Sequence, residues 1–217
     1  MSVRILIVDD HAVVREGLRM ILEATGDMTV VGEALDGREA IEKAETLRPD
    51  VIIMDISMPE MNGIEATRII CERLPMVKII ILSMHHTSEH IFRAIQAGAR
   101  AYLLKESAGA SVATAIHTVL KEQFYFGAGV EAPPNVLHTK SRTRASSPLE
   151  SLSQREREVL QLVVEGKTSV EIAEILSLSP KSVETYRSRL MLKLGVSNIP
   201  SLVKFALLHG ITPADHN

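Results

Sequence analysis

Five polar residues stand where short apolar runs of the chain end, and their types suit the transfer of a phosphoryl group. These residues are Asp9, Asp10, Asp55, Ser83 and Lys105. Parallel strands present their carboxyl ends at one edge of a sheet, so the three carboxylates should converge there. Like charges so close raise one another's pKa unless a cation compensates them, and Mg²⁺ prefers such oxygen ligands. The serine hydroxyl and the lysine ammonium would then bind phosphoryl oxygens.

A repeated pattern of apolar runs and helical segments is predicted to position these residues. Through residue 121, β-branched runs alternate with longer segments of helical periodicity, from RILIV at 4–8 to AYLL at 101–104. This alternation predicts right-handed crossovers and a parallel, doubly wound sheet with helices on both faces. We therefore expect an α/β flavodoxin-like domain at residues 1–121, with five strands in the order 2-1-3-4-5.

The later part of the chain has a different character. Residues 122–148 are predicted to be a flexible linker, because Gly, Pro, Ser and Thr crowd together from residue 127 and no apolar period survives. Residues 149–217 are then predicted to form an all-α domain of four helices joined by short turns. Ser179 followed by Pro180 is typical of a helix start.

Composition excludes several classes of protein. The 217 residues are 46% hydrophobic and 24% charged, as expected of a globular chain, and no apolar run approaches the roughly 18 residues of a membrane span. Cys71 is the only cysteine, which excludes an internal disulfide and a thiolate metal cage. Acidic residues exceed basic ones in residues 1–126, whereas residues 149–217 are balanced, which predicts different partners for the two parts. We expect a cytoplasmic protein with no membrane partner.

The first 121 residues resemble a two-component receiver domain. The resemblance rests on the DD pair at 9 and 10, on D in MDISMP, on S in ILSMHH and on K in AYLLKE. It implies that Asp55 is the phosphoacceptor, with Mg²⁺ bound directly by Asp10 and through water by Asp9. The main-chain carbonyl of Ser57 would add a further ligand.

The same resemblance implies how the phosphoryl group is bound and sensed. Lys105 would pair with it and Ser83 would hydrogen-bond to it. Movement of Ser83 would open a space that Tyr102 fills by turning inward; the alternative is that Tyr102 is a simple core residue. Pro59 limits the backbone of the loop after Asp55, and Gly63 permits a close approach that a side chain would block; the alternative is that both merely start the next helix.

Three histidines, His85, His86 and His90, follow the fourth predicted strand. No cysteine lies near them and Glu89 is the only nearby carboxylate, so we expect exposed residues at a helix start rather than a zinc site. His85 and Ser57 also lie where side chains can gate an attacking water; the alternative is that both are plain loop residues.

The segment EIAEILSLSPKSVETYRSRL predicts a helix-turn-helix, whose second helix fits the major groove of DNA. Together with LSQREREVL before it and MLKLGV after it, this segment resembles the LuxR-type output domain of NarL/FixJ response regulators. The resemblance carries over base-edge contacts to Lys181, Glu184, Thr185 and Ser188. The phosphate contacts would then be made by Arg187, Arg189 and Lys193.

The last predicted helix, residues 199–209, has more apolar surface than a terminal helix requires. By the same resemblance it forms a dimer contact, for which the candidates are Leu202, Phe205 and Ala206. The alternative is that these three residues only close the core of their own domain.

These features predict a DNA-binding transcriptional response regulator. Asp55 would accept a phosphoryl group from a sensor histidine kinase in a Mg²⁺-dependent reaction, and the homodimer would then bind double-stranded promoter DNA. No enzyme activity is expected beyond phosphotransfer to Asp55 and slow self-dephosphorylation.

Two other classes of function stay open. The first is an adaptor or phosphorelay protein whose helical tail binds protein. The second is a phosphatase or nucleotide-binding enzyme on the same kind of sheet. Against the second, DIS at 55–57 lacks the second aspartate of aspartate-nucleophile phosphatases, and no G-x-G-x-x-G follows the first strand.

Overall fold

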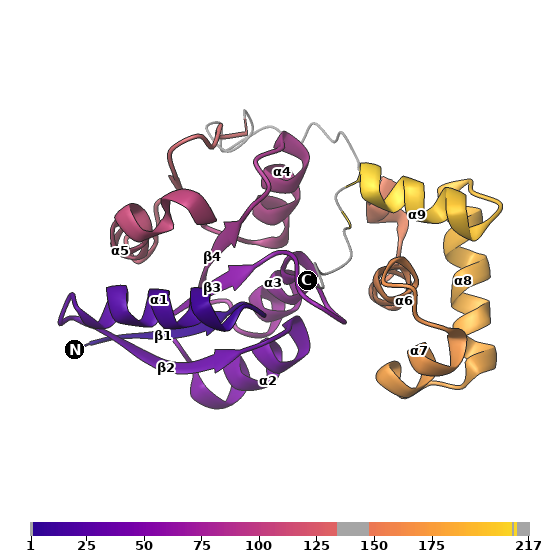
Figure 1. Cartoon of the computed structure of the whole chain (residues 1–217), viewed down its shortest axis with the longest axis horizontal. Coiled ribbons are helices and arrows are strands. Elements are labelled where there is room, and N and C mark those ends of the chain that lie inside the picture. The colour runs from indigo at the N-terminus through magenta and orange to yellow at the C-terminus, as the bar shows by residue number, and fades with distance from the viewer. Residues whose placement is uncertain (1, 134–147, 210, 212–217) are drawn as a thin grey trace. The chain divides into compact units, whose positions relative to one another are not determined.

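The chain divides into two compact units, Met1–Thr139 and Lys140–Asn217 (Figure 1). The computed structural model describes residues 2–133, 148–209 and 211. Residues 134–147, which make up most of the predicted linker, lie outside the described residues.

The first unit is built on one parallel sheet with helices on both faces. Its strands are β1 Val3–Val8, β2 Met28–Ala34, β3 Val51–Asp55, β4 Lys78–Ser83, β5 Ala101–Leu104 and β6 Tyr125–Phe126. Its helices are α1 Ala12–Glu23, α2 Gly37–Leu47, α3 Gly63–Arg73, α4 Ser88–Ala97, the 3₁₀ turn η1 Lys105–Ser107 and α5 Ala108–Val119. The strand order is β2-β1-β3-β4-β5-β6, which confirms the flavodoxin-like arrangement.

The predicted count of five strands is one short. Strand β6 pairs in parallel with β5, with Phe126 opposite Tyr102, inside the segment that the sequence assigns to the linker. Phe126 packs against the core on one face of the sheet and Tyr125 against the core on the other. A strand of two residues is too short to produce the alternation by which strands are predicted.

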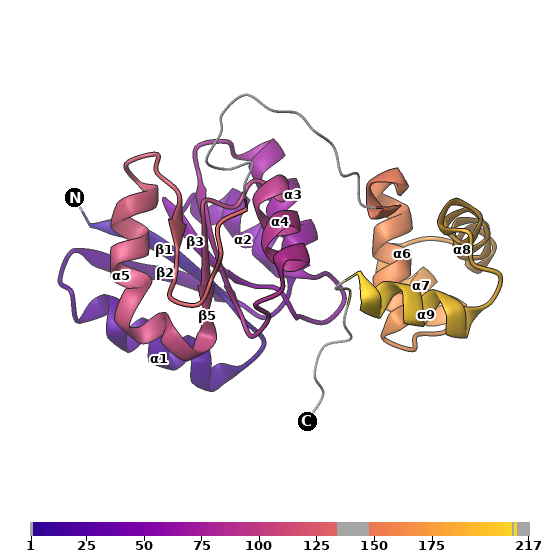
Figure 2. The ribbon, with the colours of Figure 1, turned by 90° about the horizontal axis from the view of Figure 1, so that it is seen from above.

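The two faces of the sheet are covered by different helices, as Figure 2 shows, with α1 and α5 on one face and α2, α3 and α4 on the other. Every residue of β3 and β4 is buried. This explains why both strands are continuous apolar runs rather than alternating ones, since neither face of the central sheet meets water.

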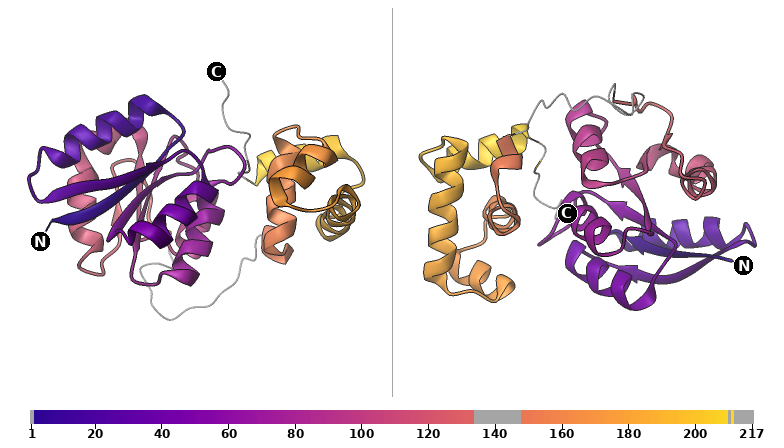
Figure 3. Two further views of the ribbon diagram at one scale, coloured as in Figure 1. Left: turned by 90° about the horizontal axis from the view of Figure 1, so that it is seen from below. Right: turned by 180° about the vertical axis from the view of Figure 1, so that it is seen from behind.

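The described part of the second unit is helical (Figure 3). A 3₁₀ turn, η2 Pro148–Ser151, precedes α6 Gln154–Val164, α7 Ser169–Leu176, α8 Pro180–Leu194 and α9 Ile199–Leu208. The side chain of Ser179 accepts a hydrogen bond from the Ser182 N–H, and Pro180 occupies the first helical turn, so the predicted start of α8 is confirmed. Helices α7 and α8 form the helix-turn-helix around a shared apolar core that includes Ile172, Val183 and Leu190.

Candidate functional site

The predicted acidic cluster forms at the carboxyl edge of the sheet. Strands β1 and β3 are neighbours, with Val8 opposite Met54, so the residues that follow them lie side by side. Ligand atoms of Asp9, Asp10, His11 and Asp55 all lie within 4.8 Å of one another. Asp9 and Asp55 are 1% and 2% exposed, and water therefore screens these charges little.

Lys105 supplies the positive charge of this cluster. It directly follows β5, and its Nζ lies 2.8 Å from Asp9 Oδ2 and 2.8 Å from Asp55 Oδ2. Burial raises the pKa of Asp55 to about 6, opposed by Lys105 and reinforced by Asp9. Burial also lowers the pKa of Lys105, but the two carboxylates outweigh burial and hold that pKa above its usual value. The lysine is therefore a fixed ammonium between two carboxylates.

The donor set of this cluster fits a hard divalent cation. Three carboxylates offer oxygens, the ligands that Mg²⁺ and Ca²⁺ take in proteins, and a single lysine balances only part of their charge. Sequence reasoning missed His11, whose Nδ1 lies 2.7 Å from Asp10 Oδ1 and 3.2 Å from Asp9 Oδ1. The position of His11 directly after Asp9 and Asp10 could have identified it as a member of the cluster. Ser57 follows Asp55 by two residues, and its role as a carbonyl ligand stays a prediction.

The loop after β3 holds the candidate phosphoacceptor through close backbone contacts. The N–H of Gly63 donates to the carbonyl of Ile56 at 3.0 Å, and the N–H of Ile56 donates to Asp55 Oδ1 at 2.7 Å. A Cβ at position 63 would lie 1.8 Å from the carbonyl oxygen of Asp55. The predicted close approach is thus confirmed, while Gly63 is also the first residue of α3.

Ser83, Tyr102 and His85 form a hydrogen-bonded group beside Asp55. The His85 N–H donates to Ser83 Oγ at 3.0 Å, and the Tyr102 hydroxyl donates to the His85 carbonyl at 2.6 Å. Ser57 Oγ lies 3.1 Å from His85 Nε2. Tyr102 is fully buried, and burial raises the pKa of its hydroxyl to about 12. The tyrosine therefore packs in the core, as one reading predicts, and its part in switching stays a prediction.

The expectation of exposed histidines is confirmed only for His86; His85 is half-buried, and the expectation is wrong for His90. Its side chain is buried and stacks on the ring of His85, with 4.4 Å between centroids and 11° between planes. Thr87 Oγ1 lies 2.7 Å from His90 Nδ1, so the start of α4 folds back over this ring. The position of His90 near the start of a helix does not by itself predict its burial, because the residues that contact its ring, His85 and Thr87, lie in the preceding loop.

Helix α8 presents most of the predicted DNA contacts to solvent. Its buried residues, Val183 and Leu190, face the core of the second unit. Six of the seven residues predicted to contact DNA are exposed, namely Lys181, Glu184, Thr185, Ser188, Arg189 and Lys193, whereas Arg187 is half-buried. The opposite face of α8 is thus available to a long polyanion.

Lys193 differs from the other predicted phosphate contacts, because its ammonium binds within the domain. Nζ lies 2.6 Å from Glu156 Oε2 and 3.1 Å from the carbonyl oxygen of Ser151. Glu156 is 3% exposed and also accepts from the N–H of Ser153, with which it forms a capping box. Lys193 therefore joins the end of α8 to the start of α6, and this internal ion pair competes with the predicted phosphate contact.

Replacing Lys193 with Met should destabilise the helical domain by about 2 kcal/mol, because a buried carboxylate would lose its cation. Burial opposes ionisation of Glu156, but Lys193 and Ser153 together hold its pKa below the usual value. The contribution of this pair is thus present above about pH 4.3 and is lost as the pH falls through the lowered value. Amide hydrogen exchange in α6 and α8 measures the effect.

Lys181→Met provides the matched control for that experiment, since Lys181 is an exposed lysine on the same helix. Exchange as slow in Lys193→Met as in Lys181→Met would show that the ion pair contributes nothing. The salt dependence of DNA binding should not change in Lys193→Met.

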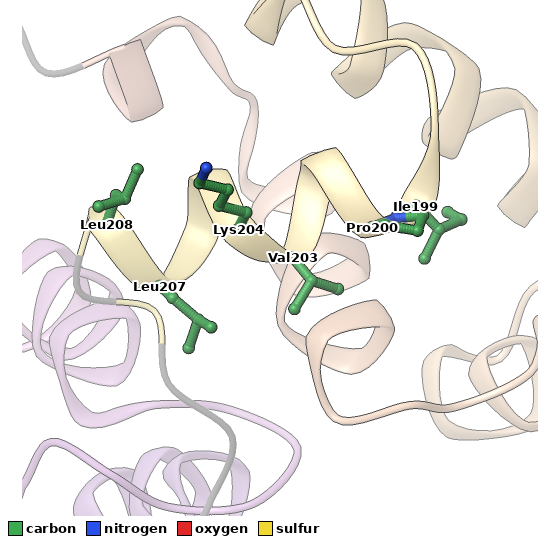
Figure 4. A pocket seen from close by; sticks show the side chains of 6 residues that line it. All are labelled: Ile199, Pro200, Val203, Lys204, Leu207 and Leu208. Atoms are coloured by element: carbon green, nitrogen blue, oxygen red, sulfur yellow. The ribbon is translucent and has the colours of Figure 1, made fainter.

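The residues predicted for dimerisation mostly serve the domain's own core. Leu202 and Ala206 are 0% exposed, and Phe205 packs partly against the same core and against His209. Leu202 and Ala206 are therefore removed from the set of dimer contacts. The surface of α9 is instead a largely apolar strip that consists of Ile199, Pro200, Val203, Lys204, Leu207 and Leu208 (Figure 4). The apolar excess of α9 was predicted, but which face it occupies was not.

None of the described helices is both long and apolar enough to cross a membrane alone. Helices α8 and α9 pass the same length and composition test only as a pair, with a bend of 61° between them. Several apolar residues of this pair, including Val183, Leu190 and Leu202, belong to the core of the helical unit.

Both units match known protein families. Residues 5–117 match response regulator receiver domains, and residues 150–206 match bacterial regulatory proteins of the luxR family. The chain is 38% identical to response regulator UvrY of Escherichia coli over 213 residues, 98% of this chain and 97% of UvrY. It is 44% identical to transcriptional regulatory protein LiaR of Bacillus subtilis over 200 residues, 90% of this chain and 92% of LiaR. Among solved structures, the two-component response regulator RcsB in complex with DNA matches with a TM-score of 0.57 and 28% identity, covering 95% of this chain and 98% of RcsB.

Proposed function

Because this chain belongs to the NarL/FixJ family of two-component response regulators, which join a receiver domain to a LuxR-type DNA-binding domain, we propose that phosphorylation of Asp55 controls its binding to promoter DNA. The observation that carries this proposal is the cluster of Asp9, Asp55 and Lys105 at adjacent strand ends, in a chain whose second unit is a helix-turn-helix. A sensor histidine kinase is the proposed phosphoryl donor.

In the proposed reaction a carboxylate oxygen of Asp55 attacks the phosphorus of a phosphohistidine, and the bond from phosphorus to the histidine nitrogen breaks. The product is an acyl phosphate on Asp55. Mg²⁺, held by Asp9, Asp10, Asp55 and the carbonyl of Ser57, would neutralise charge on the transferred group. Lys105 is already within ion-pair distance of Asp55 and would move its ammonium to a phosphoryl oxygen, while the Ser83 hydroxyl donates to another. We propose no enzyme activity beyond this phosphotransfer to Asp55 and slow self-dephosphorylation.

The DNA-binding step is tested by selecting genomic fragments with the full-length protein, with and without a small phosphodonor and Mg²⁺. We expect enrichment of a paired site whose occupancy rises on phosphorylation, because dimeric binding places two α8 helices in successive major grooves. Failure to enrich any fragment in either state would favour an adaptor whose helical domain binds protein.

We propose that the homodimer forms on DNA through the exposed strip of α9, where Leu207 is 47% and Leu208 is 73% exposed. Leu207→Asp should reduce affinity for the paired site at least tenfold, because a carboxylate would be buried at the contact, and should leave binding to a single half-site unchanged. Gel mobility and analytical ultracentrifugation of the complex measure both effects.

Met76→Asp is the control for this experiment, since Met76 is an apolar residue of the receiver domain that is also exposed, at 79% against 47% for Leu207. Dimers of Leu207→Asp on DNA with unchanged affinity would assign the contact to another surface.

A further inference from the structure

Three polar side chains connect the two helices of the helix-turn-helix. Ser169, the first residue of α7, donates a hydrogen bond to Oε1 of Glu184 on α8. Arg187, one turn further along α8, donates from Nη1 to Ser169 Oγ at 2.6 Å and to Glu184 Oε1 at 3.2 Å. We call these three residues the α7–α8 cluster.

The α7–α8 cluster changes the part that Arg187 can play. The Arg187 side chain is only 22% exposed and donates back to Ser169 on α7, whereas the side chain of Glu184 is 59% exposed. A phosphate-binding arginine needs N–H donors at the surface, and the exposed Arg189 on the same helix offers more of its side chain there than the half-buried Arg187 does. The geometry therefore favours Arg187 as a partner of Glu184 over Arg187 as a phosphate contact.

The same contacts determine what Glu184 offers to DNA. The two hydrogen bonds that Glu184 accepts within the cluster both end on Oε1, so Oε2 keeps its capacity to accept. A lone carboxylate near the phosphates of DNA would be repelled, but Arg187 at 3.2 Å compensates its charge. Among the base edges of the major groove, the amino group of cytosine is the one that a glutamate typically recognises as an acceptor.

We propose that Ser169 and Arg187 are positioning residues that hold Glu184 to accept a hydrogen bond from the N4 amino group of a cytosine in each half-site. This inference rests on the proposed DNA-binding function and extends it to one base pair. Arg187 acts through Glu184 and contacts no phosphate.

The test uses the phosphorylated full-length protein and the site enriched from genomic fragments. Affinities are measured for that site and for versions in which each base pair of the half-site is exchanged in turn. The variants are Glu184→Gln, Ser169→Ala and Arg187→Met, with Arg189→Met as the matched control. Surface pairs of this kind contribute little to stability, so the variants should fold, which circular dichroism checks.

We expect wild-type protein to prefer cytosine at one position by about tenfold, and all three cluster variants to lose most of that preference at the same position. The dependence of affinity on salt should stay unchanged in Arg187→Met, whereas Arg189→Met should lower its slope by about 1, as loss of a phosphate contact does.

Two results would overturn this inference while the proposed function stands. One is a lower salt slope in Arg187→Met with the base preference intact, which would make Arg187 a phosphate contact. The other is an unchanged base preference in Glu184→Gln. Absence of any DNA binding by the wild-type protein would instead overturn the proposed function, and this inference with it.

Discussion

Replacing Asp55 with Asn should abolish the incorporation of phosphate from a small phosphodonor in the presence of Mg²⁺. The amide has nearly the size of the carboxylate, but its neutral oxygen is a poor nucleophile, and it removes one of the negative charges around Lys105. Mass spectrometry of the intact protein measures the result directly, since each phosphoryl group adds a fixed mass. We expect the added mass in wild-type protein and none in the variant.

Asp27→Asn is the control for this prediction, because Asp27 is an exposed aspartate away from the carboxyl edge of the sheet. It should be phosphorylated like wild-type protein. Labelling that persists in Asp55→Asn would mean that another side chain is the acceptor, and peptide mapping would then locate it.

Replacing Gly63 with Ala should destabilise the receiver domain by about 3 kcal/mol or prevent its folding. The added Cβ would lie 1.8 Å from the carbonyl oxygen of Asp55, and a backbone atom in a buried strand cannot turn away as a flexible side chain can. Relief would require movement of the strand end that carries Asp55, the proposed phosphoacceptor. Urea unfolding of the variant measures the loss, and phosphorylation should fall with it.

Gly17→Ala gives the opposite expectation in the same domain. Gly17 lies within α1, and a Cβ there would meet nothing within 4 Å. Because alanine favours the helix over glycine, this variant should be more stable by about 0.5 to 1 kcal/mol. Equal stability of Gly63→Ala and wild-type protein would contradict the steric argument.

The two substitutions separate the cost of a steric clash in the packed core from the intrinsic preference of alanine for a helix. Both replace a glycine with alanine near the start of a helix or within it, yet their surroundings differ. A glycine in the sequence therefore marks a position where another part of the backbone can approach closely. Only the packed structure shows at which of these positions a larger side chain would clash.

Much of the receiver site was predictable from residue types and spacing. Asp9, Asp55 and Lys105 each follow an apolar run, and the carboxyl ends of parallel strands meet at one edge whatever the loops do. The order of the strands, the helix-turn-helix and the start of α8 at Pro180 follow from periodicity and capping residues in the same way. These features depend on contacts between residues near in sequence or on rules of topology.

Other features depend on which side chains meet across the fold, and the sequence does not contain that information in a local pattern. By its spacing Lys193 belongs to the exposed basic face of a helix, but its ammonium forms an ion pair with Glu156, 37 residues earlier. Arg187 is turned toward Ser169 on a different helix. Leu202 is apolar like Leu207, yet only packing of α9 on the domain decides that the first is buried and the second exposed.

The sequence by itself thus determined the class of fold, the meeting of Asp9, Asp55 and Lys105 at one edge of the sheet, and the helix-turn-helix, because strand ends, helix caps and amphipathic periods are short-range properties. The tertiary structure alone decided which cations of α8 have partners within their own domain, which residues of α9 form its exposed apolar strip, and that His90 stacks on His85. These outcomes depend on long-range pairing of side chains, in which burial and competition between partners decide what each charged or apolar group can still bind.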